Sequence, residues 1–253
     1  MRGGGGPARF PPDWNGAPWA VSGLLQIGVA YAAIFLAAAR IESGLSALLF
    51  GSFPIWVGVF AHRLLPRERW TPRNVSAAVL GISGVAVIEA PAAVRAMSGD
   101  AGPVFIGGLL VLFGAFVSGY ANVLVKKSLG RVPPDLNVWA QTLAGTLFLG
   151  ALAAIFERGA PIHWTPMAIA SLLYLSVLGT AVTFVGLFWL VPRVPVSVIG
   201  SIPMVDTLIA VCLGALVLNE TLSTRIVVGG AMIVAGVLMA TSEAGGRDLG
   251  VEG

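Results

Sequence analysis

Apolar runs long enough to cross a membrane follow one another along almost the whole chain. A helix needs roughly 20 apolar residues to span a hydrocarbon core about 30 Å thick. Eight runs approach or exceed this length, at about 19–39, 43–61, 74–88, 104–125, 136–156, 166–191, 194–218 and 223–241. Because lipid offers no partner to a backbone N–H or C=O group, runs without polar alternation must be helices. The sequence therefore predicts an all-α transmembrane bundle of eight spans.

The composition excludes the other classes of protein. Charged residues make up 11% of the chain and apolar residues 57%, whereas an average soluble domain has about 25% charged residues. The mean hydropathy of +0.89 is also too high for a disordered chain. The basic residues lie in short clusters between the apolar runs, so the pI near 9.5 does not indicate a nucleic-acid partner.

The distribution of positive charge predicts the orientation. Eight spans place both termini on one side, and this side receives 11 of the 15 Lys and Arg residues. The other side receives Arg40, Arg95, Arg158 and Arg225. Since the cytoplasmic side of a membrane protein carries the excess of Lys and Arg, we expect both termini in the cytoplasm.

One short motif occurs twice. Gly51-Ser52-x-Pro54 recurs 149 residues later as Gly200-Ser201-x-Pro203. Three further residues recur after 152 residues: Glu68, Arg73 and Gly84 match Glu220, Arg225 and Gly236. The orientation above places Arg73 inside and Arg225 outside, so the two copies have opposite topology. Inverted repeats are typical of secondary transporters, whose substrate site lies near the midplane between the halves.

The later half of the chain carries a recognisable set of motifs. They are 120–127 (YANVLVKK), Gln141, 178–181 (LGTA), 189–193 (WLVPR), Pro203 and 218–220 (LNE). The first half adds the repeat markers Pro54, Glu68 and Gly84, whose partners in the later half include Glu220 and Gly236. In order and spacing the chain resembles the EamA-type permeases of the drug/metabolite transporter superfamily. The resemblance implies ten helices in two inverted five-helix repeats and transport of a small molecule, with export as the direction.

The predicted organisation follows from the resemblance. It comprises a polar N-terminal segment (1–18), a first repeat of three helices (19–92), an extracytoplasmic loop (93–103), a second repeat of five helices (104–241) and a cytoplasmic tail (242–253). The family's first two helices are absent. Either the start lies upstream of Met1, which we favour, or the protein is shortened. Two apolar runs upstream in the same reading frame would support the first option, and stop codons there would exclude it.

Asp206 is the residue that most needs a functional explanation. It lies 12 residues from each end of the seventh run, where an acid costs about 2.5–3.5 kcal/mol on insertion scales. Pro203 precedes it by one turn and removes a backbone hydrogen bond, which predicts a broken helix beside the acid. Asp206 either binds a cationic group or a proton, or is a hydrogen-bonded packing residue.

Several other polar or aromatic residues within the runs are candidates for lining a cavity. They are Gln26, Tyr120, Asn122, Gln141 and Trp189. Alternatively, Tyr120 and Asn122 mark the membrane interface, and Trp189 anchors its helix at that interface. Thr180 and Thr183 are expected to bond to the backbone of their own helix.

No catalytic signature is present. The sequence has no phosphate-binding G-x-x-x-x-G-K-[ST] loop, no H-E-x-x-H and no G-x-S-x-G motif, and its single cysteine, Cys212, forms neither a disulfide nor a metal site within the chain. We therefore expect no enzyme, no catalytic residues, no metal and no cofactor.

These observations predict a permease of the cytoplasmic (inner) membrane that moves a small metabolite or drug by alternating access. The expected partners are a small-molecule substrate and the lipid bilayer, with no nucleic acid, and a homodimer is one option. The alternative is a non-transporting membrane subunit or a degenerate, truncated paralogue.

Overall fold

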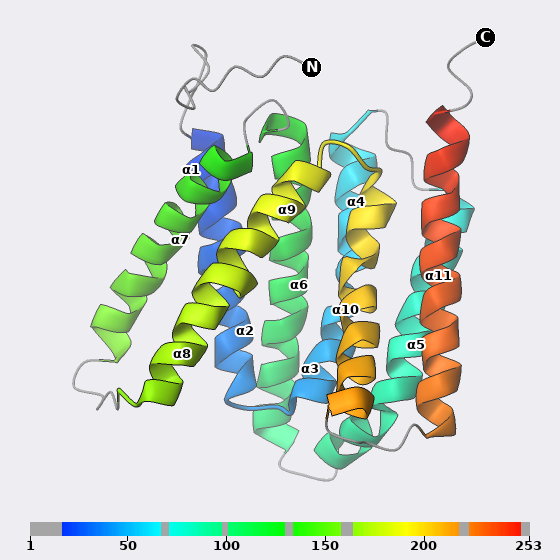
Figure 1. The fold of residues 1–253 in the computed structure, drawn as a ribbon, viewed down its shortest axis with the longest axis horizontal. Helices are drawn as coiled ribbons and strands as arrows, with labels where there is room; N and C mark the ends of the chain where they lie inside the picture. The colour runs from blue at the N-terminus through cyan, green and yellow to red at the C-terminus, as the bar shows by residue number, and fades with distance from the viewer. Residues whose placement is uncertain are drawn as a thin grey trace. The chain divides into compact units, whose positions relative to one another are not determined.

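The computed structural model describes residues 17–66, 71–97, 101–129, 134–157, 164–217 and 223–248, and all of its regular elements there are helical. In chain order they are α1 (Ala17–Gly23), a π-helical segment (Leu24–Val29), α2 (Ala30–Ala38), α3 (Ser43–Phe50), α4 (Phe53–Leu64), α5 (Pro72–Met97), α6 (Ala101–Leu129), α7 (Pro134–Phe156), α8 (Pro166–Tyr174), a second π-helical segment (Leu175–Val182), α9 (Thr183–Leu190), α10 (Val196–Val217) and α11 (Thr224–Asp248) (Figure 1).

The expectation of an all-α polytopic bundle is confirmed. Within the described residues, six helical runs are long and apolar enough to cross a membrane, and the apolar stretches Val196–Ile209 and Thr224–Ala240 are shorter. The third span is longer than its apolar run predicts, because α5 continues through Pro91 to Met97. A proline removes only one donor from a helix, and neighbouring groups in a membrane bundle compensate for it.

The two copies of the G-S-x-P motif adopt different conformations. The first copy interrupts its span, because Gly51 and Ser52 form a tight turn between α3 and α4 and Pro54 enters the first turn of α4. The second copy lies inside α10, which runs without interruption through Pro203. The expectation of a broken helix beside Asp206 is therefore wrong. The hydroxyl of Thr207 donates to the carbonyl of Pro203 at 3.0 Å, in the turn that follows the proline.

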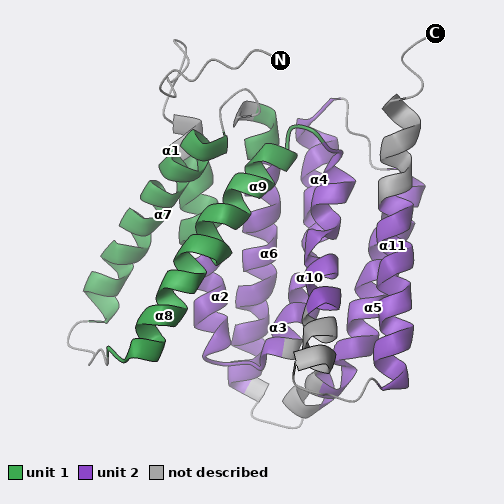
Figure 2. Ribbon diagram, viewed as in Figure 1, with its two compact units in different colours: residues 1–28, 124–193 green, residues 29–123, 194–253 purple. Residues whose placement is uncertain are grey.

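The described helices group into two compact units, which Figure 2 colours separately. Unit 1 contains residues 1–28 and 124–193, and unit 2 contains residues 29–123 and 194–253. Each unit takes helices from both predicted repeats, so the compact units do not coincide with the repeats of the sequence. The boundary between the units falls inside the first π-helical segment, after Gly28.

Helices α5 and α11 of unit 2 pack backbone against backbone, and the contacts follow the repeat. A Cβ atom placed on Gly84 would lie 2.6 Å from the carbonyl oxygen of Gly229, and one placed on Gly229 would lie 2.6 Å from that of Gly84. The same correspondence holds for the neighbouring contacts when each residue is replaced by the one 152 positions away. Gly84 also faces Ile233, and its counterpart Gly236 faces Gly81, which is the counterpart of Ile233. Such reciprocity is what a two-fold relation between antiparallel repeats requires.

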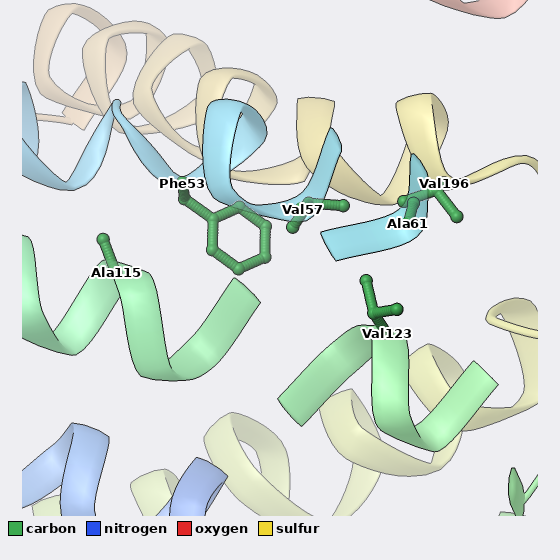
Figure 3. Close-up of a cluster of buried hydrophobic side chains, with 6 residues drawn as sticks. All are labelled: Phe53, Val57, Ala61, Ala115, Val123 and Val196. Atoms are coloured by element: carbon green, nitrogen blue, oxygen red, sulfur yellow. The ribbon is translucent and has the colours of Figure 1, made fainter. Parts of the chain in front are cut away.

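Helix α4 lies between α6 and α10 in the core of unit 2. Phe53, Val57 and Ala61 line one side of α4 and pack with Ala115 and Val123 of α6 and Val196 of α10 (Figure 3). The two G-S-x-P motifs also meet here, since a Cβ atom on Gly200 would lie 3.3 Å from the Cα atom of Pro54. The small residue of one motif therefore provides the space for the proline of the other.

Both π-helical segments fall at equivalent positions of the repeat. The second begins at Leu175, 151 residues after Leu24, and the two contain Gly28 and Gly179 at the same offset. Directly after the second segment, the hydroxyl of Thr183 donates to the carbonyl oxygen of Leu178 at 2.8 Å, five residues earlier. Thr180 bonds in the same way to Leu175. The expectation that these two threonines bond to their own helix is confirmed, with the wider spacing of a π-helix.

The close approach of α5 and α11 predicts that alanine is too large at position 84. Because Cβ would contact Gly229 and Ile233 at less than 3.0 Å, we expect Gly84→Ala to lower the free energy of unfolding by about 1–3 kcal/mol. The measurement is the thermal unfolding of the purified protein in detergent, followed by tryptophan fluorescence.

The matched control for this prediction is Gly150→Ala in α7, where a Cβ atom would have no neighbour within 4 Å. Alanine should there be neutral or stabilise the helix by up to about 1 kcal/mol. Equal unfolding temperatures for the two variants would contradict the packing described here.

Candidate functional site

Asp206 lies on the outer side of α10. Its side chain is exposed, whereas Ser201 and Met204 on the same helix are buried. The structure shows no ion pair between Asp206 and another described residue. Pro203 is partly buried one turn before it. A carboxylate in this position of an apolar span needs water, a proton or a cationic ligand.

Gln26 and Gln141 belong to elements of unit 1 that pack tightly together. Gln26 lies in the first π-helical segment and is buried, and Gln141 of α7 is fully buried. The helix that carries Gln26 approaches α7 so closely that a Cβ atom on Gly23 would lie 2.5 Å from the Cα atom of Gln141. The amide nitrogen of Gln141 donates to Asn137 Oδ1, and its Oε1 atom is buried without a partner among the described residues. These two glutamines are therefore core residues of unit 1.

Tyr120 and Asn122 are packing residues of α6. The Tyr120 ring lies 5.2 Å from the Phe60 ring, edge to face. The side-chain amide of Asn122 is buried and donates to the carbonyl oxygen of Ser118 at 2.9 Å. Both residues lie in unit 2, where the Tyr120 ring packs against α4 and the Asn122 amide bonds within α6.

Trp189 lies near the end of α9 in unit 1 and is exposed. The guanidinium carbon of Arg193 lies 4.3 Å from the centre of its ring, and the same guanidinium donates to the carbonyl oxygen of Trp189. This cation–π contact shows that the ring face accepts a cation. Trp189 belongs to unit 1 and Asp206 to unit 2.

The repeat markers divide between the core and the undescribed residues. Pro54, Gly84 and Gly236 are buried in unit 2. Glu68 and Glu220 lie outside the described residues, as does the side chain of Cys212. No group of three His, Cys, Asp or Glu residues that could hold a metal ion occurs in the part of the chain that the structure describes.

A small cavity lies within unit 2 where the two G-S-x-P motifs meet. Four helices line it: α4 along most of its length, α5 and α10 with their N-terminal parts, and α11 with its C-terminal half. Its walls are small residues, among them Pro54, Gly200 and Gly236. Its polar side chains are Asn74, Ser197 and Ser201. The sequence indicates Ser201 as part of a motif, but Asn74 and Ser197 are recognised only in the structure, because they come from the first turns of two helices that are distant in the chain.

Comparison with known proteins agrees with this architecture. The EamA-like transporter family model matches residues 5–90 and 105–242. An uncharacterized transporter of Bacillus subtilis, YoaV, is 29% identical over 219 residues, which cover 86% of this chain and 73% of that protein. A protein of Streptantibioticus cattleyicolor named as a probable terminal-alkyne amino-acid exporter is 30% identical over 213 residues, which cover 82% of this chain and 67% of that protein.

The fold also matches a solved protein. One crystal structure superimposes with a TM-score of 0.72 at 20% sequence identity, covering 93% of this chain and 78% of the other. The helices, the pattern of apolar spans and the family match lead to the same conclusion. This multi-pass membrane protein belongs to the EamA-like transporter family.

Proposed function

We propose that the protein is a secondary transporter that moves a small metabolite or drug across the cytoplasmic membrane by alternating access, in the direction of export. Both termini would lie in the cytoplasm, as the distribution of Lys and Arg predicts. The proposal rests above all on the reciprocal contacts of α5 and α11, in which Gly84 and Gly236 play equivalent roles. Antiparallel repeats related in this way are the architecture in which one half moves against the other around a central site.

The chemistry of the transported molecule is suggested by Asp206 and by one relative. An exposed carboxylate in an apolar span favours a ligand that carries a positive charge. The relative from Streptantibioticus cattleyicolor is named as an amino-acid exporter. We therefore propose small molecules with an amino group as the first substrates to test. No enzymatic activity is part of this proposal, since the relatives are named as transporters.

A second candidate is a non-transporting membrane subunit, and the exposure of the sixth span favours it. Leu178 is 50% exposed, whereas Ile27, its counterpart 151 residues earlier, is 5% exposed. The sixth span is much less buried than the first, and a second copy of the chain or another subunit would cover it. Transport by the purified chain in liposomes, with no other protein present, would exclude the subunit.

The proposed role of Asp206 predicts that its charge is needed for transport but not for folding. We expect Asp206→Asn to lower the initial rate of amino-acid transport into or out of liposomes at least tenfold and to remove its dependence on pH between about 5 and 8. Thermal stability should not fall, because an asparagine in an apolar span costs less than an aspartate. Unchanged transport with unchanged pH dependence would exclude the role.

Access of water to position 206 distinguishes two environments of Asp206: a water-filled path through the protein and a surface that faces lipid. In a Cys212→Ser background, which removes the single native cysteine, we expect Asp206→Cys to react with a water-soluble thiosulfonate reagent, because a thiol must be solvated to form the thiolate. Leu238→Cys is the control, since Leu238 is an exposed apolar residue of α11. We expect at least about tenfold slower labelling there. Equal rates would place Asp206 against lipid.

A further inference from the structure

The cavity of unit 2 is a built polar site in an otherwise apolar part of the bundle. Its volume is about 30 Å³, which is enough for one or two water-sized groups. Asn74 of α5 lines it and is 9% exposed, and the Asn74 Oδ1 atom is buried without a hydrogen-bond partner in the part of the chain that the structure describes. An unsatisfied buried acceptor destabilises the folded protein. The Asn74 oxygen is therefore available to a group that the described residues do not supply.

The two serine hydroxyls of the cavity each offer a further acceptor. The hydroxyl of Ser201 donates its hydrogen to the carbonyl oxygen of Val198 at 2.8 Å. The hydroxyl of Ser197 donates to the carbonyl oxygen of Ala240 at 3.5 Å, a long bond. With their hydrogens committed, both oxygens keep lone pairs. Asn74 Oδ1, Ser197 Oγ and Ser201 Oγ therefore give the cavity three acceptors.

The helix ends beside the cavity do not turn it into an anion site. The backbone N–H of Asn74 donates to Thr71 Oγ1 at 3.2 Å. At the start of α10, the N–H groups of Val198 and Ile199 both bond to the carbonyl oxygen of Pro195. These donors of the first helical turns are thus occupied. The residues that line the cavity include no Lys or Arg to pair with an anion, and no Asp or Glu.

The cavity occurs at one of the two positions that the repeat relates, and not at the other. Asn74, Ser197 and Ala240 correspond by the repeat offsets to Ile226, Leu48 and Ile88. Leu48 and Ile88 are large and pack against the buried cluster of Val85, Met204 and Ile233. The end related by the repeat is therefore filled, although the backbone contacts of α5 and α11 are symmetric. Small and polar side chains, and not the helix geometry, open the cavity.

We propose that this cavity binds a small monovalent cation, with Asn74 Oδ1, Ser197 Oγ and Ser201 Oγ as ligands. Neutral oxygen atoms suit an alkali ion or the ammonium group of an organic molecule, since both present only positive charge or hydrogen-bond donors. A divalent ion such as Ca²⁺ or Mg²⁺ would require carboxylates, and the lining residues include none. This site is separate from Asp206, which is exposed on α10.

The test measures binding and does not depend on transport. The full chain is purified in detergent, and its unfolding temperature is recorded in sodium, potassium or methylammonium chloride at the same ionic strength as N-methylglucamine chloride, whose cation is too large for the cavity. We expect at least one small cation to raise the unfolding temperature by about 2–4 °C at saturation. An effect of sodium or potassium alone identifies a free ion, and an effect of methylammonium alone identifies the ammonium group of an organic ligand.

Two variants locate the effect. Asn74→Leu removes the unpartnered acceptor, and Ala240→Ile fills the cavity with the residue found at the related position 88. Each should reduce the cation-dependent shift at least fourfold, and the two act by different means, so a folding defect in one leaves the other as a test. Ser83→Ala is the control, because the hydroxyl of Ser83 also donates to a carbonyl of its own helix, that of Val79, but lies outside the cavity.

Ser83→Ala should respond to the cation as the unmodified protein does. The proposal is overturned if no small cation exceeds N-methylglucamine, which would leave water as the occupant. It is equally overturned if Asn74→Leu and Ala240→Ile both keep the full shift, because the cation would then bind elsewhere.

Discussion

The contact between the backbones of α5 and α11 holds unit 2 together. Lipid tails are as apolar as leucine, so burial of apolar side chains does not drive two helices together in a membrane. Close packing of the two backbones takes the place of this hydrophobic drive. At Gly84 and Gly229 the missing side chains let the backbone of each helix lie against the carbonyl oxygen of the other. Helix α10 uses the same device, because Met204 packs where a Cβ atom on Gly81 would stand. Gly81 of α5 therefore determines how closely α10 can pack against that helix.

The departures from repeat symmetry are where the chemistry of the protein lies. Val57 is a buried core residue of α4, and its counterpart Asp206 is an exposed acid on α10. The first G-S-x-P motif interrupts its span, and the second does not. The same framework therefore presents a carboxylate on α10 but not on the related α4, and the cavity at Asn74 has a filled counterpart at the related position. A symmetric scaffold with asymmetric side chains suits a transporter, because the two faces of a membrane require different chemistry.

Unsatisfied polar groups occur in both units and mark positions that packing alone does not explain. The side-chain oxygen atoms of Gln141 and Thr142 in unit 1, and that of Asn74 in unit 2, are buried without partners among the described residues. In a medium without water each such atom costs more than in a soluble core. Asn74 also lines a cavity that contains two serine hydroxyls, which is why the cation site is proposed there.

The sequence alone determined the fold class and the positions of the apolar spans, and it predicted the repeat. Length and hydropathy suffice for these, because the bilayer imposes helices of a known length. It also led to the family, through the order of motifs in the later half. It did not determine which proline interrupts a helix: Pro203 lies within a continuous α10, and the interruption falls before Pro54. A proline removes one backbone hydrogen bond at any helix position, and the packing of the neighbouring residues determines whether the helix is interrupted there.

The tertiary structure alone decided which polar residues share a site. Asp206, Gln26, Gln141 and Trp189 look alike in the sequence, as polar or aromatic residues in apolar runs, yet they divide between two units and differ in exposure. The cavity at Asn74 joins residues from four helices, and its polar character depends on where the serine hydrogens point. Periodicity places a residue on one helix, but only the packing of helices determines what that residue faces.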